Sequence, residues 1–149
     1  MDEGEVAIVD VRIAASDGSA SEIARGEGLS VEIDYAIATP VGSPIFCITV
    51  IDVDGGTRFS ASTDQVGIVI PESSSSGHLS ARLHSIDLDP GTYFIDVGVY
   101  EANWKYAYDY HSRAYPLIVR HGGNAAREPQ LVTTKVAWLH NAREASDPV

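Results

Sequence analysis

The residues best suited to binding chemistry lie in one segment, 104–116, with the sequence WKYAYDYHSRAYP. It contains Trp104 and four tyrosines, and its second half adds an acid, an imidazole and a guanidinium. Together with Tyr100, these residues place six of the chain's twelve aromatic side chains within a window of 16 residues. Aromatic rings pack against the apolar faces of flat ligands, and polar side chains satisfy ligand hydroxyl groups. The composition therefore predicts a surface that stacks on a flat, hydroxyl-rich ligand.

Seven residues of this segment are candidate ligand contacts, and strand alternation would divide six of them into two rows. The candidates are Trp104, Tyr106, Tyr108, Asp109, Tyr110, His111 and Arg113. Unless a bulge intervenes, the tyrosine row would point to one side, and Asp109, His111 and Arg113 to the other. The second row shares parity with Leu117 and Val119, which favours an inward position. Trp104 and the tyrosine row are the stronger candidates, while the second row is as consistent with an internal network.

Asp109 and His111 lie two residues apart, and this spacing allows three other interpretations. A metal site needs three or four convergent ligands, and the sequence shows only this pair, so no metal is expected. The two side chains could instead hydrogen-bond to neighbouring residues and fix a bulge in the strand. They could also provide the chemistry of a small hydrolase accessory domain or a sugar-modifying enzyme.

Motifs of the common enzyme classes are missing from the sequence. It has no G-x-x-x-x-G-K-[ST] phosphate loop, no G-x-S-x-G elbow and no H-E-x-x-H. The serines at 73–76 form a low-complexity segment, predicted to be a loop, with no evident base partner. We therefore expect none of these chemistries, and we expect no cofactor.

The overall charge limits the possible partners. The net charge is −11 and there are only two lysines, Lys105 and Lys135. Such a field repels phosphate backbones, so nucleic acid is not an expected partner, and a neutral or cationic ligand is easier to accommodate. The single cysteine, Cys47, cannot form an internal disulfide, which favours a reducing compartment. Cys47 lies in an apolar alternation and is predicted to be a small core residue.

The pattern of apolar residues predicts one domain of eight or nine short strands, which is typical of an antiparallel β-sandwich. The segment 29–39 is the least ambiguous strand, because Leu29, Val31, Ile33, Tyr35 and Ile37 alternate with polar residues. Within 64–77, a short strand is a weaker prediction. The expected strands are 5–14, 29–39, 45–53, 57–62, 79–88, 93–100, 105–119 and 131–140.

Two further features refine this prediction. Pro90 and Gly91 form a turn before Tyr93, an arrangement typical of the tyrosine corner of immunoglobulin-like sandwiches, in which the phenol bonds back to the corner's backbone. The expected domain comprises a sandwich at 1–120, a connector at 121–130, a terminal strand at 131–140 and a tail at 141–149. That apolar strand follows a long connector, so it could complete a neighbour's sheet in a dimer.

The sequence resembles a known family. PGTYFIDVGVY at 90–100 followed by YAYDYHSRAYPLIV at 106–119 is similar to the C-terminal domain of Wzt, the nucleotide-binding subunit of ABC transporters that export O-antigen polysaccharide. The specific part is YDYHSRAYP at 108–116. A weaker similarity extends over the opening strand V-x-I-x-x-V-x-I, RGEGLSVEIDY, PIFCITVIDVDG and the terminal strand with Trp138.

The resemblance implies an immunoglobulin-like sandwich that binds the capped non-reducing end of a finished polysaccharide without catalysis. It also implies a homodimer with an exchanged C-terminal strand. The partners would be the ATPase domain and the transmembrane subunit of the exporter, with the domain in the cytoplasm at the inner face of the inner membrane. The alternative is a fibronectin-like module that binds another protein.

Overall fold

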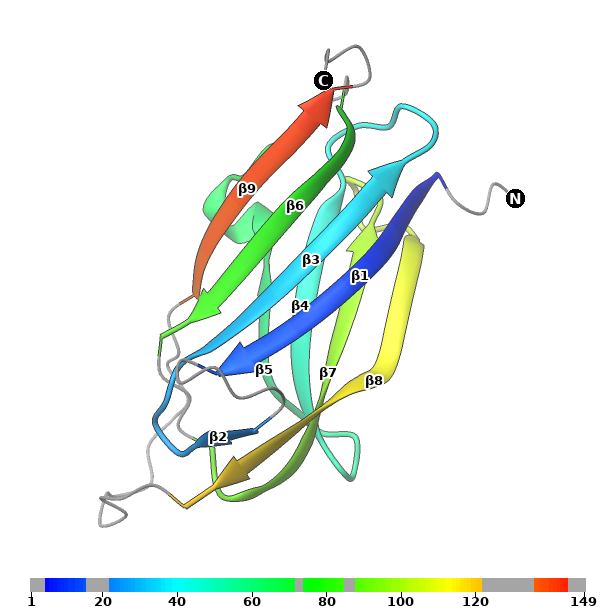
Figure 1. The fold of residues 1–149 in the computed structure, drawn as a ribbon. Coiled ribbons are helices and arrows are strands. Elements are labelled where there is room, and N and C mark those ends of the chain that lie inside the picture. Colours follow the sequence, from blue (N-terminus) through cyan, green and yellow to red (C-terminus); the bar gives the residue numbers. More distant parts are fainter. Residues whose placement is uncertain (1–4, 16–21, 72–73, 85–87, 122–135, 145–149) are drawn as a thin grey trace.

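The computed structural model describes residues 5–15, 22–71, 74–84, 88–121 and 136–144. Within them the chain forms nine strands and one short 3₁₀ helix (Figure 1). In chain order the elements are β1 (Val6–Ala15), β2 (Glu22–Ala24), β3 (Leu29–Ile37), β4 (Ile45–Asp52), β5 (Thr57–Ser62), η1 (Thr63–Val66), β6 (Ser74–Leu83), β7 (Gly91–Tyr100), β8 (Ala107–Arg120) and β9 (Val136–Glu144).

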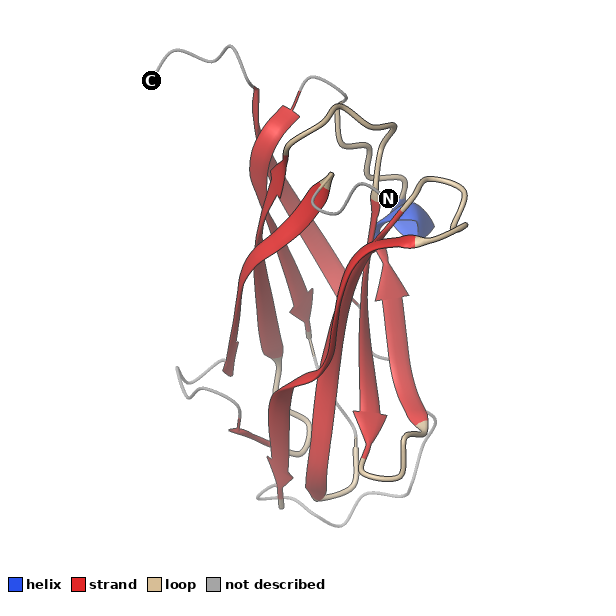
Figure 2. Ribbon diagram, turned by 90° about the vertical axis from the view of Figure 1, so that its right-hand side faces the viewer, coloured by secondary structure: helices blue, strands red, loops and turns tan. Residues whose placement is uncertain are grey.

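The strands form two sheets that pack face to face, as Figure 2 shows. The four-stranded sheet has the order β1-β3-β6-β9, and the five-stranded sheet has the order β2-β8-β7-β4-β5. Every pairing is antiparallel except that of β2 with β8. The predicted all-β, immunoglobulin-like sandwich is confirmed. The three-residue strand β2 was not predicted.

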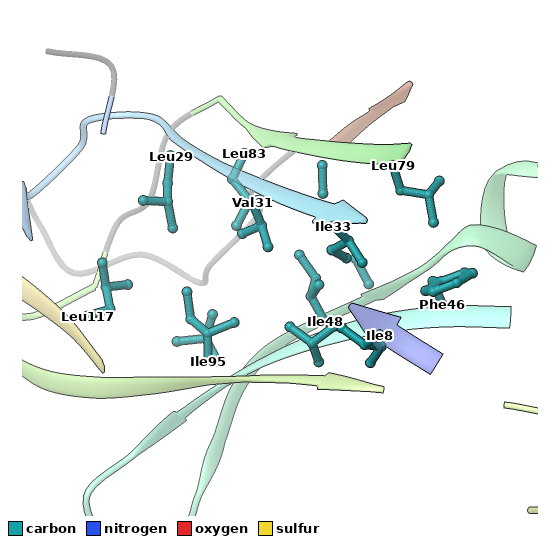
Figure 3. Close-up of a cluster of buried hydrophobic side chains, with 14 of the residues drawn as sticks. Ile8, Leu29, Val31, Ile33, Phe46, Ile48, Leu79, Leu83, Ile95 and Leu117 are labelled. Atoms are coloured by element: carbon teal, nitrogen blue, oxygen red, sulfur yellow. The ribbon is translucent and has the colours of Figure 1, made fainter. Parts of the chain in front are cut away.

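Alternating apolar residues on both sheets build the core between them (Figure 3). In β3 every second side chain is buried, from Leu29 to Ile37, as the sequence predicted. On the five-stranded sheet, the inward side chains of β4 and β7 include Phe46, Ile48 and Ile95. The residues between them on those strands therefore point to the outer face of this sheet.

The tyrosine corner is also present. The Tyr93 hydroxyl donates a hydrogen bond of 2.7 Å to the carbonyl oxygen of Asp89, four residues upstream. The ring itself is buried, at 6% exposed. This contact fixes the start of β7, the strand that carries the centre of the site described below.

Three local predictions are wrong. Serines 74–76 are not a loop but the beginning of β6, because Ser76 and Gly77 pair with β3 and the backbone ladder outweighs their weak strand propensity. The segment 67–71 forms no strand, although Ile70 is buried there and its amide donates to Ser43 Oγ at 2.9 Å. Cys47 is half-buried on the outer face, outside the core.

The terminal strand β9 pairs with β6 of the same chain and runs four residues further than the predicted end at 140. Residues 131–135 of the predicted strand, and the connector from 122 onward, lie outside the described residues. On the inner face of β9, Val136 and Trp138 pack against the core. Also on that face, His140 Nε2 lies 2.7 Å from the Tyr35 hydroxyl.

This phenol–imidazole pair lies against a strand position that has no room for a side chain. Burial raises the pKa of Tyr35 to about 12 and lowers the pKa of His140, so at neutral pH the phenol is protonated and the imidazole is neutral. A Cβ added to Gly77 would lie 2.3 Å from the Tyr35 hydroxyl oxygen and 2.8 Å from the Asn141 carbonyl oxygen. The glycine on β6 is therefore required for β3 and β9 to meet through this pair.

We predict that Gly77→Ala lowers the free energy of unfolding by about 1–3 kcal/mol or more, because the methyl group overpacks a closed site. Gly42→Ala is the matched control, since a Cβ added there meets no atom within 4 Å. Urea denaturation of both variants measures the difference. Equal stability of the two variants would contradict the packing described for Gly77.

Candidate functional site

The aromatic segment predicted to bind a ligand spans the β7–β8 hairpin and the first half of β8. Two irregularities interrupt its pairing with β7. Between Ile95 and Val97, β7 supplies one residue where β8 supplies three, and a second shift lies between Val99 and Tyr100. The two regular rows that were expected in the absence of a bulge are therefore not formed. Bulges move side chains between faces without any change in the residue pattern.

The larger bulge is organised by Asp96 of β7. This carboxylate is 6% exposed and lies opposite the extra residues of β8. Its Oδ1 accepts the backbone N–H of Arg113 at 2.7 Å, and its Oδ2 accepts the Tyr110 hydroxyl at 2.8 Å. Arg113 has a φ of 53°, a left-handed conformation that is uncommon for a residue with a side chain. Asp96 thus holds both the bulge and the ring of Tyr110.

Three rings lie together on the outer face of the five-stranded sheet, and we call Tyr100, Trp104 and Tyr110 the aromatic patch. The Tyr100 ring lies 6.2 Å from that of Tyr110, edge to face, and 5.0 Å from that of Trp104. The Tyr110 ring covers Gly98, where an added Cβ would lie 2.7 Å from the ring. Trp104 and Tyr110 remain 44% and 43% exposed, so the patch is open to a ligand.

The indole of Trp104 is fixed from two sides. Its backbone has a φ of 63° in the hairpin, and its N–H donates to the Glu101 carbonyl oxygen at 2.7 Å. Its Nε1 donates to Asp64 Oδ2 in η1 at 3.1 Å. Asp64 also accepts a short hydrogen bond from the Ser62 hydroxyl. The patch therefore depends on a carboxylate 40 residues away in sequence.

The phenol of Tyr110 is a fixed donor. Burial, and secondarily its hydrogen bond to Asp96, raise the pKa of this phenol above its ordinary value of 10.0. The hydroxyl therefore stays protonated at neutral pH, with its proton directed to Asp96. A ligand would meet the exposed part of the ring and the free lone pair of the oxygen.

Asp109 and His111 lie elsewhere, where β8 meets the edge of β1. Asp109 Oδ2 accepts the backbone N–H of Ile8 in β1 at 2.8 Å, and its Oδ1 accepts the N–H of Tyr110 at 2.9 Å. His111 Nδ1 lies 2.5 Å from the Tyr115 hydroxyl, and its Nε2 lies 3.7 Å from Asp109 Oδ2. We call this group the β1–β8 seam. The hydrogen bond between Ile8 and Asp109 joins the two sheets, and the other contacts lie within β8. This agrees with the interpretation of Asp109 and His111 as an internal network.

Tyr106 and Tyr108 form an edge-to-face pair with ring centres 5.3 Å apart. The second register shift turns Tyr108 toward the core, against which it packs, and burial raises the pKa of this phenol to about 12. Tyr106 is 50% exposed in the hairpin. The predicted tyrosine row is therefore divided, with Tyr110 in the aromatic patch and Tyr108 against the core.

Arg113 lies on the same outer face as the aromatic patch, because the bulge reverses its predicted inward direction. Its guanidinium carbon lies 5.5 Å from the centre of the Phe94 ring. One terminal nitrogen donates to the Val53 carbonyl oxygen at 3.2 Å. Phe94 alternates with the core residues Tyr93 and Ile95, which places it on the outer face.

On the outer face of the four-stranded sheet, several charged groups pair with one another. His78 lies between two carboxylates, 2.6 Å from Asp34 and 2.5 Å from Glu32, and these bonds raise the pKa of its imidazole. Arg12 bonds to Asp34 at 2.9 Å. These internal pairs leave the five-stranded sheet as the better candidate for ligand binding.

Sequence reasoning missed three residues of the site: Asp64, Asp96 and Tyr100. Asp96 could have been noticed as the only charged residue in the apolar run FIDVGVY. Asp64 had no local signal, because its partner is distant in sequence. Across the described residues, no group of three or more His, Cys, Asp or Glu side chains could hold a metal ion.

We predict that Asp96→Ala lowers the free energy of unfolding by at least about 2 kcal/mol, because hydrogen bonds to a charged acceptor contribute roughly 1.5–3 kcal/mol. The control is Asp54→Ala, at an exposed turn position, for which we expect a change within about 0.5 kcal/mol. Thermal unfolding of the two variants gives the comparison. A loss as small as that of the control would show that Asp96 does not support the bulge.

Comparison with known proteins identifies the family. A family model described as "Wzt C-terminal domain" matches residues 2–129. A solved structure titled "Crystal structure of the C-terminal domain of wzt" is similar to the chain, with a TM-score of 0.68 and 12% sequence identity. The alignment covers 100% of this chain and 85% of that chain, and at this identity it concerns the fold. None of the curated protein sequences matches the chain.

The Wzt C-terminal domain is a non-catalytic domain with a carbohydrate-binding role in O-antigen ABC transport. The ATPase domain of the transporter is not contained in the 149 residues of this chain. The family match agrees with the resemblance found in the sequence, which is most specific at 108–116 and extends more weakly over most of the chain. The chain belongs to the Wzt C-terminal domain family.

Proposed function

We propose that this domain binds the capped non-reducing end of an O-polysaccharide at the outer face of its five-stranded sheet, and so couples the finished polymer to export. The observation that carries the proposal is the aromatic patch, in which buried or fixed carboxylates orient exposed rings. Tyr110 is held by Asp96, and Trp104 is held by Asp64.

The patch has the physical properties that sugar recognition requires. Sugars present apolar C–H faces, which pack against aromatic rings, and a rim of hydroxyl groups. The rings of Tyr100 and Trp104 are inclined by 42°, so together they form an angled surface rather than a flat one. Because hydrogen bonds already fix Trp104 and Tyr110, binding would cost little side-chain entropy.

The seven residues predicted from the sequence would then have different roles. Trp104 and Tyr110 would contact the sugar directly, and Tyr106 would extend the contact along the hairpin. Asp109, His111 and Tyr108 would shape β8 from its inner side. Arg113 lies at the other end of the same face.

The surroundings of the domain follow from the same proposal. It would act beside the ATPase domain and the transmembrane subunit of the exporter, in the cytoplasm at the inner face of the inner membrane. No helix in the described part of the chain is long and apolar enough to cross a membrane.

We predict that Trp104→Ala weakens binding of the O-polysaccharide from the source strain by roughly 10-fold or more, because the exposed indole offers a large apolar contact area. Stacking of a nucleic-acid base on an aromatic side chain, a comparable contact, contributes about 1–3 kcal/mol. The matched control is Leu139→Ala, which shortens a 53% exposed apolar side chain on the other sheet, and should leave the dissociation constant within about twofold. Isothermal titration calorimetry on folded variants measures both.

End recognition is tested in the same titration with polymer whose terminal cap has been removed. Wild-type protein should bind capped chains with a fixed number of sites per chain end, whatever the chain length. It should lose affinity for uncapped chains. Binding that is equal for both, with a stoichiometry that follows chain length, would contradict end recognition while leaving carbohydrate binding intact.

We also propose a homodimer in which β9 is exchanged between protomers. The inner face of β9 contributes Trp138 and His140 to the core, so the strand belongs in a sandwich. An identical set of contacts with β6 would form if the strand came from a second copy. The long segment between β8 and β9 supports such an exchange.

We predict that cysteines placed on β6 and β9 form a disulfide between two chains. Ser80 and Leu139 are direct partners in the β6–β9 ladder, close enough for a disulfide after substitution. The test protein is Ser80→Cys/Leu139→Cys in a Cys47→Ser background, oxidised and run on a non-reducing gel. A covalent dimer is expected, and Ser80→Cys alone is the control. A crosslink within one chain would show that β9 stays in its own sheet.

A further inference from the structure

We propose that Arg113 is a binding site for an anionic group of the polysaccharide, a carboxylate or a phosphate ester, at the end of the binding face opposite Trp104. This inference rests on the proposed function and adds the chemical class of the ligand. Among the described residues, Arg113 forms no ion pair, although the chain carries 21 acidic and 10 basic residues. Its side chain is exposed on the face that carries the aromatic patch.

The position of this guanidinium is fixed before any ligand binds. The backbone of Arg113 is anchored by its N–H bond to Asp96, and the side chain then crosses the Phe94 ring. One terminal nitrogen donates to the Val53 carbonyl oxygen. An arginine has five N–H donors in a planar fork that matches carboxylate and phosphate oxygens. The one donor used internally orients the fork and leaves the others for a ligand.

The nearest turn does not neutralise or cover the guanidinium. Asp52, at the end of β4, accepts two backbone N–H groups of the turn, from Asp54 and Gly56, and both Nε and a terminal nitrogen of Arg58. Its charge is therefore already matched. Gly55, whose added Cβ would lie 3.7 Å from the Arg113 guanidinium, has no side chain to cover it.

Arg82 is an exposed arginine whose side chain, unlike that of Arg113, is not held in place. It is exposed on the outer face of the four-stranded sheet, between the core positions Ala81 and Leu83 of β6. No ion pair or hydrogen bond fixes it among the described residues. An unfixed arginine must lose rotamer freedom on binding an anion, whereas Arg113 has already lost much of it.

The composition alone favoured a neutral or cationic ligand, and the local arrangement of Arg113 alters that expectation. A net charge of −11 weakens the approach of anions from a distance, but screening reduces this effect beyond about 8 Å at physiological salt. At contact, the fork of Arg113 can form charge-assisted hydrogen bonds with an anion. The ligand that fits both ends of the face has an apolar sugar surface for the aromatic patch and an acidic substituent nearby.

The test measures O-polysaccharide from the source strain against wild-type protein, Arg113→Gln and the control Arg82→Gln. Three forms of the polymer are used: untreated, carboxyl-reduced and dephosphorylated. With untreated polymer we expect Arg113→Gln to weaken binding on the order of 10-fold or more, since hydrogen bonds between charged groups are stronger than neutral ones. Arg82→Gln should bind as wild type does.

The treated polymers identify the anion. If it is a carboxylate, carboxyl reduction weakens wild-type binding and removes the difference from Arg113→Gln, and dephosphorylation does neither. If it is a phosphate ester, dephosphorylation weakens wild-type binding and removes the difference from Arg113→Gln, and carboxyl reduction does neither. Persistence of the full difference with both treated polymers would overturn the inference. If Trp104→Ala weakens binding and Arg113→Gln does not, the inference fails and the proposed function stands.

A second measurement does not depend on the polysaccharide. In ¹H–¹⁵N spectra of wild-type protein, titration with methyl phosphate or acetate should shift the Nε–H signal of Arg113 and leave that of Arg82 almost unchanged. Equal shifts of the two signals, or none, would show that Arg113 is an ordinary surface arginine. The NMR titration therefore tests the anion site of Arg113 even if the polymer does not bind and the proposed function fails.

Discussion

The buried carboxylate of Asp96 is the interaction on which the binding face depends. A charge in the middle of a sheet is costly unless hydrogen bonds satisfy it, and here the donors come from two residues of the neighbouring strand. One donor belongs to a side chain and the other to the backbone. As a result, a single acid determines both where β8 bulges and how Tyr110 lies on Gly98.

The β1–β8 seam complements this arrangement on the other side of β8. There the Asp109 carboxylate accepts a backbone N–H from the first strand of the opposite sheet. Edge strands expose unpaired N–H groups that invite pairing with other chains. A side chain that occupies one of them protects the edge of β1 and, at the same time, ties the two layers together. β8 is thus held by one acid on each of its faces.

Much of the fold could be predicted because it follows from local patterns. The alternation in β3 and the turn before Tyr93 gave correct predictions, since each depends on residues close in sequence. The site was predicted only in part. Whether Arg113 points inward or outward depends on a bulge, and the bulge depends on Asp96, 17 residues away. Strand alternation contains no information about such a contact, and the same is true of Asp64 beneath Trp104.

The left-handed backbone of Trp104 has a consequence for the evolution of the domain. A residue with a Cβ in this conformation costs on the order of 1 kcal/mol, and glycine would remove that cost. Selection for thermal stability alone would therefore favour glycine at this hairpin position, and selection for an oriented indole opposes it. Stability and recognition therefore compete at Trp104. Among stabilised variants obtained by random mutagenesis, replacement of Trp104 by glycine should be enriched, with loss of the indole ring.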